Sequence, residues 1–190
     1  MTDAVSQQGK IMRPTLRYAF IYGGLASTVL AAFIAVLGLY HDQTGWVASL
    51  AFGSSVMLVA MSFIFVGVKR YRDVEQGGVI RFWRALGLGL LIALIACLAY
   101  ALIWEVYLAI TQYRFMDDYI AGALAKARAS GASPAKIARM TADFNQARAM
   151  YANPVIRLLM TMSEVAPIGV LVAFVSAALL RFPKFLPARA

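Results

Sequence analysis

Residues 82–111 read FWRALGLGLLIALIACLAYALIWEVYLAIT, and Arg84 and Glu105 are the charged side chains in this run. A helix rises 1.5 Å per residue, so the run is longer than the roughly 20 residues that cross about 30 Å of hydrocarbon. Three further apolar runs cover about residues 18–40, 46–68 and 155–180. Lipid offers no partner for backbone polar groups, so each run is expected to be a continuous helix. The sequence predicts an all-α polytopic membrane protein, a single membrane domain over residues 1–190 with four transmembrane helices.

Composition supports this class. Hydrophobic residues make up 62% of the chain and charged residues 14%, whereas a soluble domain has about 45–50% and about 25%. These values exclude a soluble globular enzyme, a disordered protein and a disulfide-stapled secreted domain. The chain has one cysteine, Cys97, and one histidine, His41, so we predict no catalytic constellation, metal site or cofactor.

Orientation follows from basic residues near the span ends. Basic residues gather in three segments that we assign to one side of the membrane. The tail 1–17 has Lys10, Arg13 and Arg17, and the C-terminal tail has Arg181, Lys184 and Arg189. The segment between spans two and three, with the start of span three, has Lys69, Arg70, Arg72, Arg81 and Arg84. The first loop on the other side has His41 and Asp42 and no Lys or Arg. Residues 112–154 also hold six basic residues, but the rule weakens for long segments. We predict a bacterial inner-membrane protein with both termini in the cytoplasm.

The segment 112–154 is predicted to be an extracytoplasmic helical hairpin between spans three and four. Ser130-Gly131 is a helix-stop signal, and Ser133-Pro134 is typical of an N-cap followed by proline in the first turn. Apolar residues then recur at intervals of three and four up to Tyr151, which places one apolar stripe on the second helix. The two helices could pack on each other as a cap, or the hairpin could dock a protein partner.

Small residues recur every four positions in two spans, as Gly23, Ser27, Ala31 and Ala35 in the first and as Ala85, Gly89, Ala93, Cys97 and Ala101 in the third. Helix association in lipid depends on close backbone approach. The two ladders therefore predict tight helix packing, with homo-oligomerisation as an alternative use.

Two of the chain's three glutamates, Glu105 and Glu164, lie inside spans, where a charge is costly. Both fall in the outer half of the membrane when counted from the span ends. With Arg157 and Thr161 they predict an intramembrane polar cluster. Three interpretations stay open: a structural ion-paired cluster, a proton-sharing pair that gates an ion or substrate, and a two-carboxylate metal or hydrolytic site.

A second group consists of the cytoplasmic cations Lys69, Arg70, Arg72, Arg81 and Arg84. Such a cluster can hold anionic lipid head groups, or it can simply anchor the protein by the positive-inside rule. The chain has 18 Lys and Arg against nine Asp and Glu, but no nucleic-acid-binding motif accompanies them, so no nucleic-acid partner is expected.

Several segments resemble the bacterial membrane proteins grouped as domain of unknown function 4199. The resemblance rests on Phe65–Asp73, Gly77-Gly78, Trp104-Glu105, Phe115-Met116 and Ser163–Gly169, and it covers roughly residues 15–182. It implies a four-span helical membrane protein with an external insertion between spans three and four, and it implies no particular activity.

The leading functional hypothesis is a non-enzymatic accessory or scaffold subunit of a cell-envelope complex. The alternative is a small oligomeric carrier or channel that uses Glu105 and Glu164 as a protonation site. A membrane hydrolase or transferase ranks third.

Overall fold

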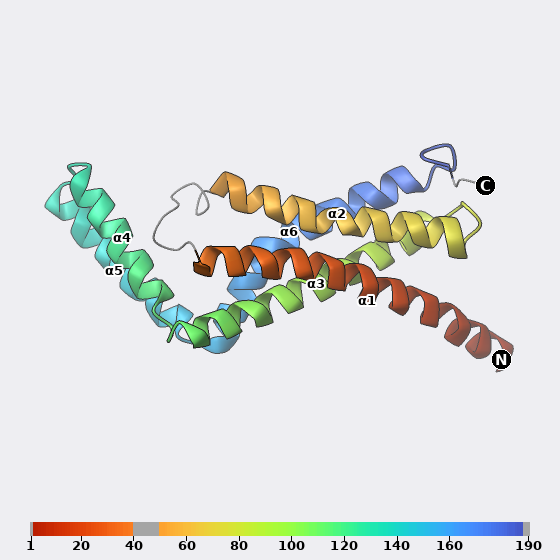
Figure 1. Cartoon of the computed structure of the whole chain (residues 1–190), viewed down its shortest axis with the longest axis horizontal. Coiled ribbons are helices and arrows are strands. Elements are labelled where there is room, and N and C mark those ends of the chain that lie inside the picture. Colours follow the sequence, from red (N-terminus) through yellow and green to blue (C-terminus); the bar gives the residue numbers. More distant parts are fainter. Residues whose placement is uncertain (1, 40–49, 188–190) are drawn as a thin grey trace. The chain divides into compact units, whose positions relative to one another are not determined.

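The computed structural model describes residues 2–39 and 50–187, with side chains from residues 14–37 and 52–187. Over these residues the chain is all-helical and contains no strand. Figure 1 labels the helices α1 (Thr2–Leu39), α2 (Leu50–Glu75), α3 (Phe82–Ile110), α4 (Phe115–Ala129), α5 (Pro134–Tyr151) and α6 (Pro154–Leu180). They form two compact units, unit 1 from residues 1–100 and 162–190 and unit 2 from Ala101–Thr161.

Four helical segments are long and apolar enough to cross a membrane, namely Pro14–Leu37, Phe52–Glu75, Phe82–Ile110 and Pro154–Leu180. The prediction of an all-α chain with four apolar spans is therefore confirmed. The predicted end of the first span at Tyr40, the start of the second at Trp46 and the loop with His41 and Asp42 lie outside the described residues.

Helix α2 continues beyond the predicted span end at Val68. About two turns rich in charged residues prolong it to Glu75. In these turns Lys69 Nζ lies 2.6 Å from Asp73 Oδ2 in an i,i+4 pair, an arrangement that supports a helix. The helix ends where Gly77 and Gly78 take φ values of +61° and +85°, a backbone region that favours glycine. The turn is closed by the Gly78 amide, which donates to the Arg72 carbonyl at 3.0 Å.

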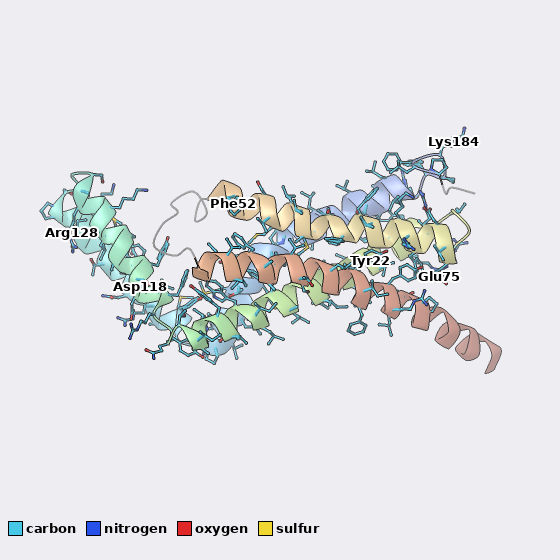
Figure 2. The ribbon with its side chains drawn as sticks, viewed as in Figure 1. Tyr22, Phe52, Glu75, Asp118, Arg128 and Lys184 are labelled. Atoms are coloured by element: carbon cyan, nitrogen blue, oxygen red, sulfur yellow. The ribbon has the colours of Figure 1, made fainter. Side chains whose placement is uncertain are left out.

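In unit 1, α1 and α2 lie side by side (Figure 1). The buried face of α1 follows helical spacing through Tyr18, Tyr22, Ala26, Leu30 and Ile34, as a helix packed along one stripe requires. Tyr22 is labelled on this helix in Figure 2. Its neighbour Tyr18 meets the ring of Tyr71 edge to face, with centroids 5.4 Å apart.

The helices of unit 1 approach each other closely at several glycines, among them Gly23, Gly89 and Gly169. A Cβ added at Gly23 would lie 2.7 Å from Ile95 Cγ2, and one added at Gly89 would lie 3.0 Å from Ala173 Cβ. At Gly169 the added atom would lie 3.0 Å from Ala93 Cβ. Helix α3 therefore packs on α1 through Gly23 and on α6 through Gly89 and Gly169.

In unit 2, α4 and α5 lie side by side and contact each other (Figure 1). The ring of Tyr119 meets that of Phe144 edge to face at 6.2 Å, which joins the apolar stripes of the two helices. Helix α4 has acidic residues in its first turn and basic residues in its last, among them Asp118 and Arg128, labelled in Figure 2. This order complements the helix dipole. Ser133 caps α5 by accepting from the Lys136 amide at 3.3 Å, as its sequence predicts.

Candidate functional site

A two-point ion pair joins α3 and α6 within unit 2. Arg157 Nε donates to Glu105 Oε1 and Nη2 donates to Oε2, both at 2.6 Å. The side chain of Arg157 is 8% exposed and that of Glu105 is 25% exposed. A planar guanidinium matches a carboxylate at two points, so the position of Arg157 is fixed as well as its charge compensated.

Aromatic rings complete the environment of this pair. The guanidinium carbon of Arg157 lies 5.1 Å from the ring centre of Tyr113 and 5.6 Å from that of Tyr151, within the range of cation–π attraction. Arg157 Nη1 also donates to the Tyr151 carbonyl at 3.0 Å. Trp104 Nε1 donates to the Tyr151 hydroxyl at 2.7 Å. The ion pair of Arg157 and Glu105 is therefore flanked by the aromatic side chains of Tyr113, Tyr151 and Trp104, and we call these residues the polar cluster.

The turn after α3 is strained at the point where it meets this cluster. Gln112 and Tyr113 have φ values of +54° and +57°, which are unusual for residues with a side chain. The Tyr113 amide donates to the Leu108 carbonyl at 2.7 Å, which closes the helix end. This conformation carries Tyr113 back over Arg157, and strain of this kind is characteristic of functional sites.

The cluster forms one wall of a cleft of about 610 Å³ in unit 2. Its mouth holds an ion pair, with Arg148 Nη2 2.8 Å from Asp117 Oδ1. The lining residues are Gln112, Tyr113, Met116, Asp117, Arg148, Tyr151, Ala152, Pro154 and Arg157. The cleft therefore combines two cations, one carboxylate and two tyrosine rings, a mixture suited to recognising a small polar ligand.

The other members of the predicted intramembrane cluster are placed as follows. Thr161 is buried, and its hydroxyl donates to the Arg157 carbonyl at 2.9 Å. Glu105 and Glu164 belong to different units, so a cluster shared by the two glutamates stays a prediction. Glu105 has Arg157 as its partner, whereas Glu164 is exposed and no described residue forms a hydrogen bond or ion pair with it.

The two glutamates lie at different distances from the ends of their own helices. Glu105 is five residues from the end of α3 at Ile110, about 8 Å, whereas Glu164 is ten residues from the start of α6 at Pro154, about 15 Å. For a hydrocarbon core of about 30 Å, Glu105 falls near the edge of the core and Glu164 near its middle. That both glutamates lie in the outer half of the membrane stays a prediction.

The cations predicted to be cytoplasmic have unequal environments. Arg70, Arg81 and Arg84 are exposed, and Lys69 is half-buried. Arg72, expected with this group, is instead fully buried. Its Nε donates to Asp73 Oδ1 at 2.7 Å, and its Nη1 and Nη2 donate to the carbonyls of Phe185 and Leu186. Arg72 therefore holds the C-terminal segment to the end of α2.

The two small-residue ladders also differ. Ala85, Gly89, Ala93 and Cys97 are all buried within unit 1, so this ladder is covered by the chain's own helices. In α1 Gly23 is buried, Ser27 donates to the Gly23 carbonyl at 2.7 Å, Ala31 is half-buried and Ala35 is exposed. A spacing of four drifts around a helix of 3.6 residues per turn, which moves the later members of the α1 ladder off the packed face.

The sequence places Trp104 and Tyr113 near the end of the third span, and it gives no sign that Tyr151 meets either of them. The Trp104–Tyr151 contact joins residues 47 positions apart, which no local pattern reveals. Among the residues that the structure describes, no group of three His, Cys, Asp or Glu side chains is placed to hold a metal ion.

Comparison with known proteins gives a family. No curated protein and no solved structure matches the chain. The family model described as "Protein of unknown function (DUF4199)" matches residues 17–181, which include all four apolar spans from Arg17 onward and the whole of unit 2. The chain therefore belongs to the DUF4199 family of proteins of unknown function.

Proposed function

We propose that this protein is a non-enzymatic accessory or scaffold subunit of a complex in the bacterial inner membrane. In this proposal both termini are cytoplasmic, and α4 and α5 form a hairpin on the outer side. The observation that supports a partner in the plane of the membrane is Glu164, which is exposed and has no ion-pair partner among the described residues. Counted along α6, it lies about halfway through the hydrocarbon.

An exposed carboxylate at this depth is unfavourable against lipid tails. A charged side chain near the centre of a span costs about 2.5–3.5 kcal/mol on insertion scales, and such residues normally face another protein segment or water. Beside Glu164 an apolar groove runs along α6, lined by Ser163, Ala166, Pro167, Val170, Leu171 and Phe174. Small side chains at one end of this groove permit a neighbouring helix to approach closely.

The charge of Glu164 favours a helix of a different protein over a second copy of this chain as the partner in this groove. A second copy of the chain packed on the same face would bring one Glu164 toward another, because a two-fold contact uses the same patch on both subunits. A transmembrane helix of a different protein with a Lys, Arg, Ser or Thr opposite Glu164 would instead satisfy the acid. We therefore infer a heterologous helix with a hydrogen-bond donor at mid-membrane.

Site-directed photo-crosslinking in native membranes tests this proposal. A photoreactive residue replacing Leu171, in the groove, should give one defined adduct, whereas the same residue at Leu102 on α3, also exposed, should not. The adduct should be lost in Glu164→Leu and retained in Glu164→Gln, since glutamine keeps an acceptor. Its partner should carry a donor residue within a span. An adduct of two copies of this chain, or one insensitive to Glu164→Leu, would contradict the proposal.

A carrier or channel is the second candidate, and the same exposed acid supports it. The ion pair with Arg157 occupies Glu105, so a proton-carrying role falls to Glu164 alone and not to a glutamate pair. In this case Glu164→Gln should abolish proton flux in proteoliposomes while the fold persists. A scaffold should show no proton flux, whether position 164 holds glutamate or glutamine. The presence or absence of proton flux therefore distinguishes the two functions.

The exposed cations Arg70, Arg81 and Arg84 support a further element of the proposal, contact with anionic lipids at the cytoplasmic face. Basic residues near a membrane surface contribute about 1 kcal/mol each toward anionic lipid. Arg72 takes no part in this contact because it is buried.

A further inference from the structure

We propose that the cleft of unit 2 binds the head group of a zwitterionic phospholipid that carries a primary amine. In this site Arg148 and Arg157 bind the phosphate, and Asp117 binds the ammonium. This binding site is independent of the helix-docking role of Glu164, and it assigns a ligand to the one part of unit 2 where charges, aromatic rings and backbone strain coincide.

The cleft lies at the depth of lipid head groups. Its lining begins with Gln112, two residues after α3 ends at Ile110, and it includes Pro154, the first residue of α6. Both helices are candidate membrane spans, so these positions fall where the hydrocarbon gives way to water. Tyr113 and Tyr151, two of the lining residues, are of the type enriched at this boundary.

The ion pair at the mouth can exchange partners at little cost. The side chains of Arg148 and Asp117 are 59% and 52% exposed, and ion pairs this exposed contribute little to stability. A phosphate can therefore take the place of Asp117 against Arg148, provided that a cation replaces Arg148 against Asp117. A phosphate and an amine on one head group meet both conditions together.

Arg157 supplies a preorganised donor to the same ligand. A guanidinium has five N–H bonds, and the hydrogen bonds of Arg157 to Glu105 and to the Tyr151 carbonyl use three of them. One N–H on Nη1 and one on Nη2 remain, and Arg157 lines the cleft. Because Glu105 and the rings of Tyr113 and Tyr151 already fix this side chain, a phosphate binds it without the usual cost of ordering an arginine.

Charge balance favours a zwitterion over an anion. The positive charges of Arg148 and Arg157 are matched by Asp117 at the mouth and by Glu105 behind Arg157. An anionic head group would separate Asp117 from Arg148 and leave that carboxylate without a cation. A choline head group would bring a cation but no N–H to donate to Asp117, so a primary amine fits best.

Titration of the intact protein in detergent, followed by native mass spectrometry, tests the site. The probes are short-chain diacyl phosphatidylethanolamine, phosphatidylglycerol and phosphatidylcholine, together with water-soluble glycerophosphoethanolamine. Phosphatidylethanolamine should bind about tenfold more tightly than the other two lipids, the ratio given by about 1.4 kcal/mol from one charge-assisted hydrogen bond. Equal binding of phosphatidylglycerol would overturn the assignment.

Matched variants on α4 and α5 locate the binding. Arg148→Gln and Asp117→Asn should each weaken phosphatidylethanolamine binding about tenfold. Arg139→Gln and Asp143→Asn change exposed charges on α5 outside the cleft and should leave it unchanged. All four positions are exposed, so the fold is expected to survive, and circular dichroism verifies this. Equal losses in the two pairs would show binding by general surface charge and refute the site.

The soluble probe distinguishes a lipid from a free zwitterion of the same chemistry. Binding of the diacyl form at least about tenfold more tightly than glycerophosphoethanolamine supports a membrane lipid, since buried acyl CH₂ groups contribute about 0.8 kcal/mol each. Equal affinity for the two would assign the cleft to a soluble amine-phosphate compound and would overturn the lipid assignment.

Discussion

At the scale of the residue, the structure separates charged side chains that look alike in the sequence. Arg72 and Arg70 stand two positions apart in one basic run, yet Arg72 is fully buried and Arg70 is exposed. The difference arises from the carbonyls of Phe185 and Leu186, more than a hundred residues further along. Positive-inside counting locates such cations relative to the membrane, but it carries no information about which of them a distant segment will bury.

The pair of Glu105 and Arg157 gives the first prediction. Glu105→Gln and Arg157→Gln should each destabilise the protein, because removal of one partner leaves a poorly compensated charge behind. The double variant should lose less than the sum, with a coupling of about 0.5–3 kcal/mol, as for residues in one network. Unfolding free energies in mixed detergent micelles measure this coupling.

Glu164→Gln combined with Arg157→Gln is the control for this cycle. Glu164 has no ion-pair partner among the described residues, so the two effects should add within about 0.5 kcal/mol. A coupling as large as that of Glu105 would mean that Glu164 shares the polar cluster after all, as the sequence reasoning proposed.

Among the elements, the helices whose bounds depend mainly on apolar length are predictable from the sequence. Apolar length alone predicts α3 as 82–111 and α6 as 155–180, and the observed helices are Phe82–Ile110 and Pro154–Leu180. The same rule fails at the end of α2, because the pairing of Lys69 with Asp73 prolongs the helix past the apolar run. The aromatic contacts of Trp104, Tyr113 and Tyr151 are not predictable, since they depend on how α3, α5 and α6 meet.

Adjacent glycines in α1 give the second prediction. Gly23→Ala should lower stability by about 1–3 kcal/mol, the usual cost of overpacking, because the new Cβ would lie 2.7 Å from Ile95 Cγ2 and 3.3 Å from the Ile92 carbonyl oxygen. Gly24→Ala meets nothing within 4 Å and should be neutral or stabilising, since alanine favours a helix over glycine. Thermal unfolding in detergent compares the two variants. Similar melting temperatures would contradict the prediction that close packing of α1 on α3 at Gly23 stabilises the protein.

At the scale of the whole molecule, each of the two units has its own source of cohesion. Unit 1 depends on small residues and close helix contact, as at Gly89 and Ala173, because apolar side chains gain little by leaving lipid. Unit 2 depends on polar and aromatic contacts such as Arg157 with Glu105 and Tyr119 with Phe144.

The orientation of the chain in the membrane gives the last prediction. Single cysteines replacing Gln76, between α2 and α3, and Ala132, between α4 and α5, are introduced into a Cys97→Ala background. A membrane-impermeant thiol reagent added to intact cells should label the cysteine at 132 and leave the one at 76 unlabelled until the cells are opened. The physical reason is the group of exposed cations Arg70, Arg81 and Arg84 near position 76, which the positive-inside rule retains in the cytoplasm. Residues 112–154 also carry six basic residues, but the rule has little force over so long a segment. Labelling of the cysteine at 132 alone would place the cleft of unit 2 at the outer leaflet. Labelling of the cysteine at 76 in intact cells would instead mean the opposite orientation, with the cleft against lipid of the cytoplasmic leaflet.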